Sequence, residues 1–273
     1  MSIFEIQEGE QDNTTPEQLA QLILLARNYQ KKCVDQGWHK AEPAAVSPLS
    51  MCLQKLCFEY IERFHTQRRS RMSAVLDAEL WKASEVNEEI QCLVDESIRT
   101  NRLRNVTIPS PSTTARMSLM VANSAYVVAK SALVFIKILA DYCECFVALP
   151  EFAADILSRV VELLKGFNSR CCQLILGAGA LQLVGLKTIS VRNLALASRS
   201  LQLIVHIVPL VTKEAELALK DDQVHLLRHI KQWEVSSSVP SPSFQQICRQ
   251  MQKFHNGLSG IIPDEQVKVL LLF

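Results

Sequence analysis

The 273-residue sequence predicts an all-α fold, and three features carry that prediction. Leucine, alanine, glutamine, glutamate and arginine are abundant, and all of them favour helices. Glycine occurs only 8 times and aromatic residues make up only 6% of the chain, which argues against a turn-rich β-sandwich. No segment shows a convincing strand alternation, and no repeat stands out. Hydrophobic residues amount to 48%, enough for a sizeable core.

The first predicted helix begins after Thr15 and ends near Gly37. Thr15 can cap it, Pro16 suits its first position, and Gln18 completes a capping box. Four apolar residues share one face of this helix: Leu19, Leu22, Ile23 and Ala26. Gly37 is a natural helix stop.

A short linker containing Pro43 and Pro48 leads into a longer predicted helix, from about residue 49 towards residue 80. Its apolar residues keep the three-and-four spacing: Leu53, Leu56, Cys57, Tyr60, Ile61 and Phe64. A basic run in this helix could form a nucleic-acid or sorting patch: Arg68, Arg69 and Arg71. Acidic residues flank the run on both sides: Glu59, Glu62, Asp77 and Glu79. A solvated helix face is therefore the favoured interpretation.

Residues 101–117 form the best linker of the first half, with Pro109 and Pro111 among serines and threonines. The apolar stretch 118–149 follows and closes at Pro150. We expect five divisions of the chain: an N-terminal helix and linker (1–48), a helical segment (49–108), a linker (109–117), a helical C-terminal-type domain (118–235), and a linker with truncated terminal helices (236–273).

The next predicted helix begins at Pro150, and Gly166 and Asn168 mark its expected end. Its apolar face comprises Ile156, Leu157, Val160, Val161 and Leu164. Residues 169–219 predict two or three further helices, one of them broken or kinked at Pro209. A second linker at 234–243 precedes a last amphipathic helix with Ile247, Met251 and Phe254 on one face, and Pro263 opens a final turn.

The stretch QLILGAGALQLVGLKT, residues 173–188, decides whether the chain is an enzyme. Gly177 and Gly179 could belong to a dinucleotide-binding loop, but the third glycine of that fingerprint falls on Gln182. No acid to bind a ribose follows before Glu214. Close packing of two helices is the favoured interpretation, through four small residues: Gly177, Ala178, Ala180 and Gly185. A nucleotide-binding enzyme that uses the loop is the alternative.

No catalytic, cofactor-binding or metal-ligating residue is predicted. His225 and His229 are one helical turn apart, but no third ligand is nearby, and we expect both to face solvent. His206 has an apolar setting typical of a neutral core histidine. Four cysteines match no zinc spacing and are expected to be buried thiols: Cys143, Cys145, Cys171 and Cys172.

Charge and targeting features predict a cytosolic chain. The net charge of +1 gives no bulk attraction to nucleic acid or to an acidic membrane. The N-terminus does not resemble a signal peptide, and the 9 cysteines, an odd count, indicate free thiols. No segment is expected to reach the ~18–20 apolar residues of a membrane span.

One segment departs from this even charge balance. Between Glu162 and Glu214 every charged residue is basic, which predicts a basic face: Lys165, Arg170, Lys187, Arg192, Arg199 and Lys213. A peripheral membrane-binding bundle that uses Lys187, Arg192 and Arg199 against anionic lipid is a second alternative.

Four stretches of the sequence carry a family resemblance. The longest is ELLKGFNSRCCQLILGAGALQLVGLKTISVRNLALASRSLQLIVHIVPLV, residues 162–211. Two follow it, LLRHI at 226–230 and VPSPSFQQICRQMQKFHNGL at 239–258, and FEYIERFHTQRRSRMSAVLDAELWKASEV at 58–86 lies upstream. Together they resemble the vacuolar protein sorting-associated protein 54 family, over most of the chain after about Cys52.

This resemblance implies a subunit of the Golgi-associated retrograde protein complex, which tethers endosome-derived vesicles at the trans-Golgi network. It implies an elongated stack of helix bundles, without catalytic residues or cofactors. The implied partners are vacuolar protein sorting-associated proteins 51, 52 and 53, SNARE proteins through the family's N-terminal region, and endosomal or Golgi membrane, but no nucleic acid. The implied location is the cytosolic side of the trans-Golgi network and endosomes, with peripheral association.

The chain departs from the family pattern in three respects. It begins well inside the family protein, so we expect the region that assembles with the other subunits and meets SNARE proteins to be missing. It lacks a helical segment between Ile230 and Trp233, and it stops at Phe273 where the family continues. We therefore expect a fragment or splice variant, with apolar surface exposed near Leu226, Ile230 and residues 270–273.

Overall fold

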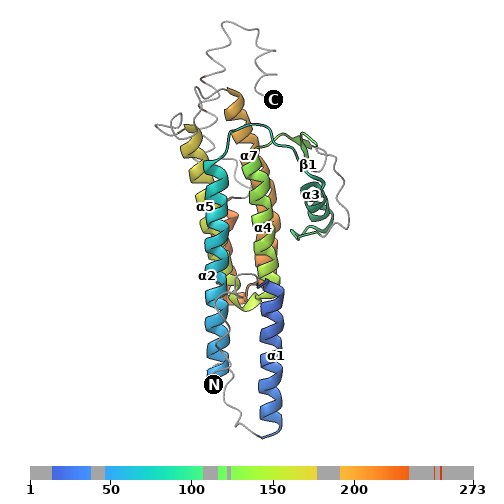
Figure 1. The fold of residues 1–273 in the computed structure, drawn as a ribbon, viewed down its shortest axis with the longest axis vertical. Helices are drawn as coiled ribbons and strands as arrows, with labels where there is room; N and C mark the ends of the chain where they lie inside the picture. Colours follow the sequence, from blue (N-terminus) through green and yellow to red (C-terminus); the bar gives the residue numbers. More distant parts are fainter. Residues whose placement is uncertain are drawn as a thin grey trace.

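The computed structural model describes residues 14–37, 47–106, 116–121, 124–176 and 191–233, together with residues 249 and 253. Within these ranges the chain is almost entirely helical, which confirms the all-α prediction. Four long helices form its centre: α2 (Pro48–Asp77), α4 (Lys130–Ala148), α5 (Ala153–Leu176) and α7 (Val191–Ala218). Figure 1 shows them side by side along the longest axis, so the bundle is elongated, as expected.

The four helices pack around one core, with α4 between α2 and α7, and with α5 between α7 and α2. Ion pairs join Glu62 to Arg159 and Asp77 to Arg170, so α2 and α5 run in the same direction. Only the 3₁₀ turn η2 (Pro150–Phe152) and Leu149 separate α4 from α5, and these two helices are antiparallel. The most extensive helix contact is between α4 and α7.

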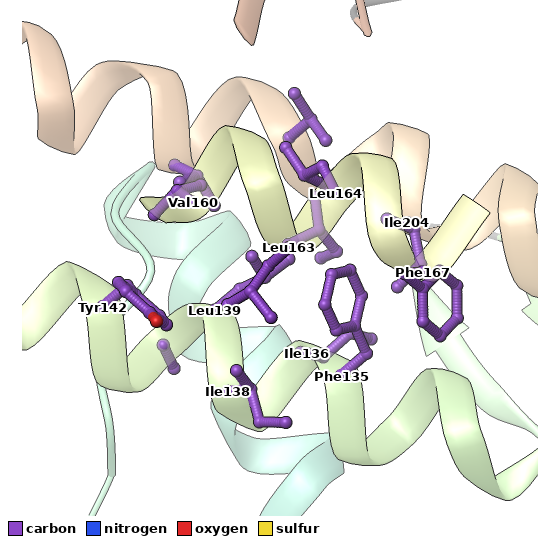
Figure 2. Close-up of a cluster of buried hydrophobic side chains, with 14 of the residues drawn as sticks. Phe135, Ile136, Ile138, Leu139, Tyr142, Val160, Leu163, Leu164, Phe167 and Ile204 are labelled. Carbon is purple, nitrogen blue, oxygen red and sulfur yellow. The ribbon is translucent and has the colours of Figure 1, made fainter. Parts of the chain in front are cut away.

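Large apolar side chains fill the space between α4, α5 and α7, as Figure 2 shows. The rings of Phe135 and Phe167 are stacked, with centroids 4.2 Å apart and planes 4° from parallel. An aromatic pair of this kind adds roughly 0.5–1.5 kcal/mol to the stabilisation from buried area. Phe64 of α2 meets Tyr142 of α4 edge to face at 4.9 Å, so α2 shares the same core.

The first helix, α1 (Pro16–Asp35), has the predicted caps. Thr15 accepts a hydrogen bond from the backbone N–H of Gln18, and the Gln18 side chain accepts one from the N–H of Thr15. Gly37 has φ +73°, a left-handed conformation that a side chain would strain, and this explains the stop. Figure 1 shows α1 below the end of α4, beside the lower part of α2.

The predicted end of the helix after Pro150 is wrong. Instead of ending at Gly166 or Asn168, α5 continues to Leu176. Phe167, Cys171 and Leu174, on the turns that follow Gly166, are at most 2% exposed. Burial of these side chains outweighs the ~1 kcal/mol of helix propensity that one interior glycine costs.

Similarly, α7 is not broken at Pro209, which lies inside one continuous helix. Pro209 is exposed, whereas Val208 and Leu210 beside it are buried, so packing holds the helix across the missing hydrogen bond. By length and composition, residues 192–218 of this helix could cross a membrane, and most of them are buried inside the bundle. The expectation that no segment is long and apolar enough to span a membrane was therefore wrong.

Between α2 and α4 the chain makes an arm that the sequence did not predict. It holds α3 (Glu88–Thr100) and a two-stranded antiparallel hairpin of β1 (Leu119–Val121) and β2 (Ser124–Tyr126). The expected absence of strands was wrong, because three-residue strands are too short to show alternation. Figure 1 places the arm beside the upper part of α4.

After α7, a 3₁₀ segment η3 (Asp221–Leu227) leads into the short helix α8 (Arg228–Lys231). The linker predicted at 101–117 is partly packed, since Leu103 is completely buried. The predicted linker at 234–243, and the terminal helix with Ile247, Met251 and Phe254, lie almost wholly outside the described residues, as do Pro263 and residues 270–273. The five expected divisions stay a prediction.

Candidate interaction surface

The glycine stretch that frames the enzyme question lies outside the described residues. The residues outside include Gly177, Ala178, Gly179, Ala180 and Gly185. The two interpretations of the stretch, close helix packing and a nucleotide-binding loop, therefore stay predictions. Among the described residues, no group of three histidine, cysteine, aspartate or glutamate side chains could hold a metal ion.

His65 on α2 joins α4 and α5 through a buried polar contact that the sequence analysis missed. Its side chain lies among apolar residues and is almost completely buried. Nδ1 is 2.8 Å from the hydroxyl oxygen of Tyr142, and Nε2 is 3.3 Å from a carboxylate oxygen of Glu162. Burial lowers the pKa of His65, and the nearby Glu162 carboxylate acts against this shift. The contact orients three helices relative to one another.

A charged cluster fastens the arm to the bundle. Glu214 on α7 is 1% exposed and accepts two hydrogen bonds from Arg102, at 2.7 and 2.9 Å, and one from Arg104, at 3.0 Å. Arg104 also pairs with Glu144 of α4 at 3.1 Å. The hydrogen bonds from Arg102 to Glu214 raise the pKa of Arg102. The segment after α3 is therefore clamped onto α4 and α7.

The basic residues of the second half do not all remain available for a partner. Arg170 pairs with Asp77 of α2, at 2.6 and 2.9 Å. The guanidinium carbon of Arg199 lies 4.1 Å from the ring centroid of Tyr126, and the guanidinium donates a hydrogen bond to the carbonyl of Ala125 at 2.9 Å. Arg192 is exposed, whereas Lys187 lies outside the described residues. The predicted basic face is thus reduced, because counting charges along one segment ignores acids on neighbouring helices.

The basic run of α2 is mostly solvated, as the favoured interpretation expected. Arg69 and Arg71 are exposed, and Arg69 pairs with Glu162 at 3.1 Å. Arg68 is half-buried, with its guanidinium 3.7 Å from the ring centroid of Phe64 and 3.3 Å from Asp141. Acids on α4 and α5 therefore partner this run.

The predicted burial of His206 is wrong, since this side chain is exposed on α7. Its ring meets the edge of Tyr126, with centroids 5.8 Å apart. His225 and His229 are exposed, as predicted. Three of the four cysteines are buried as expected, and burial raises the pKa of each thiol: Cys143, Cys145 and Cys171. Cys172 is only half-buried.

The predicted apolar surface near the end of α8 is also wrong where the structure describes it. Ile230 is completely buried, and Leu226 is half-buried against the core. Among the described helices, α1 carries the most exposed large apolar side chains. On this helix Leu22 is 44% exposed, Leu24 60%, Leu25 67%, Tyr29 62% and Val34 39%.

We call Leu22, Leu25 and Tyr29 the α1 stripe. It lies beside the buried face of α1, which Leu19, Ile23 and Cys33 form. In the lower part of Figure 1, only α1 and α2 are drawn as helices. Two packed helices cannot cover more than one face of each other, so the stripe stays exposed within the described part of the chain.

Comparison with known proteins gives a consistent family. A family model described as "Vps54-like protein" matches residues 123–257. "Vacuolar protein sorting-associated protein 54" of Caenorhabditis elegans is 43% identical over 308 residues, covering 94% of this chain and 29% of that protein. Its namesake in Homo sapiens is 38% identical over 253 residues, covering 81% of this chain and 26% of that protein.

A plant relative, "Vacuolar protein sorting-associated protein 54, chloroplastic" of Arabidopsis thaliana, is 39% identical over 94 residues, 34% of this chain and 9% of its own length. The chain thus spans less than a third of the length of these relatives. No solved structure matches it significantly.

Proposed function

Because the chain belongs to the Vps54-like family, we propose that it is a non-enzymatic, helical part of a vesicle-tethering subunit. In this proposal the subunit acts in retrograde transport from endosomes to the trans-Golgi network. The proposal rests above all on one observation, the 43% identity that extends over 94% of the chain. Identity at this level across almost the whole chain argues for a shared fold and shared surfaces.

The contacts of the polar side chains support a scaffold. His65 and Arg170 each join side chains on different helices, and Glu214 joins α7 to the segment after α3, so each of these contacts fixes how elements pack. A tether has to keep its shape while it bridges two membranes, so a rigid, elongated bundle suits that task. Its interactions with other proteins then depend on the side chains that remain outside the core.

The proposed partners are the other subunits of the Golgi-associated retrograde protein complex, namely vacuolar protein sorting-associated proteins 51, 52 and 53. The proposed location is the cytosolic side of trans-Golgi network and endosomal membranes, with peripheral attachment. Arg192 is one exposed cation on α7 that could contribute to membrane or partner contact.

The test is co-purification from cells that express the tagged full chain. We expect at least one of the three other subunits to be recovered with the chain, and we expect the tagged chain to co-localise with a trans-Golgi marker. The matched control is the same chain with Phe135→Asp and Phe167→Asp, which disrupts the core. Recovery of none of the three subunits with the well-folded chain would contradict the proposal.

A further inference from the structure

We propose that the arm between α2 and α4 is a strap, which opens as one unit while the bundle of four long helices stays folded. One end of the strap is a hinge, and a group of charged side chains holds the other end. We call this group the latch: Arg102, Arg104, Glu144 and Glu214. The inference goes beyond the proposed role in transport, which assigns no moving part to the chain. It is tested on the purified protein, so either proposal can fail while the other stands.

The arm is tied together internally, as a body that moves as one unit has to be. The backbone groups of Val86 and Arg116 exchange two hydrogen bonds, at 2.7 and 3.1 Å. The Gln91 side chain of α3 bonds both backbone groups of Met120 in β1, and β1 pairs with β2. Since α3 packs chiefly against β1, its main neighbour among the described elements lies within the arm.

The two ends of the arm meet at the bundle and form the hinge. Glu79, just after α2, accepts hydrogen bonds from the backbone N–H groups of Trp81 and Ser131, at 3.1 and 2.8 Å. The N–H of Ser84 donates to the carbonyl of Val128 at 3.0 Å, so the outgoing and returning segments lie side by side. Glu79 and Trp81 are buried, and Figure 1 shows the arm leaving the bundle near its upper end. Burial and backbone hydrogen bonds therefore anchor this end of the arm.

The latch lies near the opposite end of α4. Arg102 and Arg104 both pair with Glu214 of α7, and Arg104 also pairs with Glu144 in the last part of α4. Leu103, between the two arginines, adds one completely buried apolar side chain. The attraction within a buried ion pair is largely offset by the loss of hydration, so an apolar contact of similar size often holds as well or better. The latch therefore fixes where the arm sits more than it adds to stability.

Between the hinge and the latch, charged side chains again join the arm to the bundle. Lys137 of α4 pairs with Glu89 of α3. On α7, Arg199 donates to the carbonyl of Ala125 and lies over the ring of Tyr126. Partly exposed ion pairs contribute only about 0–1 kcal/mol each, and salt screens them. The strap should therefore open more readily at high ionic strength.

Opening of the strap uncovers the outer face of α4. Lys137 and Glu144, which pair with the arm, share one line on α4 with Leu133 and Ala140, because the four residues follow at intervals of three and four. Leu133 is buried and Ala140 is completely buried. The arm thus controls access to an apolar part of the central helix.

Cys143 reports on this opening, because its thiol lies beside the latch. Burial raises the pKa of the thiol, and the next largest influences on it come from latch side chains. Arg104 also lies 3.5 Å from the carbonyl oxygen of Cys143. Burial raises the pKa of Cys145 too, but the first charged group that acts on this thiol is Arg68 of α2. Two residues of a helix are about 200° apart around its axis, so the two thiols lie on different sides of α4.

The experiment labels the purified, native 273-residue chain with N-ethylmaleimide and follows each cysteine by peptide mass spectrometry. Each rate is divided by that of the same cysteine in the urea-unfolded chain. We expect Cys143 to react at least about ten-fold faster than Cys145, which requires local unfolding of α4, and Cys171, which requires unfolding of the bundle. Sodium chloride at about 1 M should raise the rate at Cys143 relative to the rates at the other two.

The matched variants are Glu144→Gln in the latch and Glu216→Gln, which removes the same charge from an exposed position of α7 outside the latch. Glu144→Gln should speed the labelling of Cys143 several-fold and Glu216→Gln should leave it unchanged, while circular dichroism shows that both variants stay helical. Equal rates at Cys143, Cys145 and Cys171 would overturn the proposal, because the thiols would then react only when the bundle unfolds. So would a rate at Cys143 that neither salt nor Glu144→Gln changes, since charge would then not hold the strap.

Discussion

Nδ1 of His65 on α2 lies 2.8 Å from the hydroxyl oxygen of Tyr142 on α4, and both side chains are at most 2% exposed. Two helices are thus joined by a polar contact inside an otherwise apolar core. Desolvation favours the neutral imidazole, and for that reason the pKa of His65 is lowered from its ordinary value of 6.5. The contact therefore makes stability depend on pH.

The direction of this dependence follows from proton linkage. The folded protein holds His65 neutral at pH values where the unfolded chain binds a proton, so its contribution is complete above about pH 6.5 and is lost as the pH falls. We expect the free energy of unfolding to decrease between pH 7.5 and 5.5, by urea titration. The His65→Gln variant should lose part of that decrease. An identical pH dependence in the two proteins would contradict the role of this histidine.

Removal of the Glu214 carboxylate should strongly destabilise the protein. The carboxylate is 1% exposed and accepts three hydrogen bonds, from Arg102 and Arg104, which would lose their partner. Breaking a buried ion pair costs about 3–5 kcal/mol, and the half-exposed arginines place Glu214→Ala towards the lower end. The comparison is Glu216→Ala, two residues away on the same helix and exposed, which should change the free energy of unfolding by less than about 0.5 kcal/mol. Equal effects of the two substitutions in urea unfolding would refute this account.

The Gln91 side chain should protect the free edge of β1. Its amide donates to the carbonyl of Met120 and accepts from the N–H of Met120, both at 2.9 Å, as a neighbouring strand would. An uncovered strand edge exposes such backbone groups to water. Gln91→Ala should therefore speed amide hydrogen exchange at Met120, measured by mass spectrometry. Exchange on α5 should remain unchanged, and protection of Met120 equal to that in the parent chain would show that the edge is covered in another way.

Local signals predicted much of the fold, whereas contacts between distant segments could not be predicted. The caps of α1 involve neighbouring residues, Thr15, Pro16 and Gln18, and the structure reproduces them. Arg102 and Glu214 are 112 positions apart, so nothing in the local sequence connects them. The same limit explains the reduced basic face, because the acid that neutralises Arg170 comes from another helix.

Burial of the histidines depended on helix phase, which the apolar neighbourhood alone does not reveal. His65 comes four residues after Ile61 and seven before Met72, both buried, and this spacing places it on the core face. His206 has apolar neighbours along the chain but lies one turn before the exposed Pro209. The spacing would have identified His65 as a core residue, while His206 required knowledge of which face of α7 meets α4.

Two glycines that the sequence analysis treated alike, as helix ends, should respond oppositely to alanine. Gly166 lies inside α5, and an added Cβ would be 3.5 Å from Cε of Met72, an ordinary contact. Gly166→Ala should therefore stabilise the protein by roughly 0.5–1 kcal/mol, through helix propensity and a less flexible unfolded chain. Gly37 has φ +73°, where a side chain is strained, and Gly37→Ala should destabilise by about 1 kcal/mol although no atom crowds the site. Urea unfolding of both variants gives the comparison, and a shift in the same direction for both would mean that backbone conformation does not govern these positions.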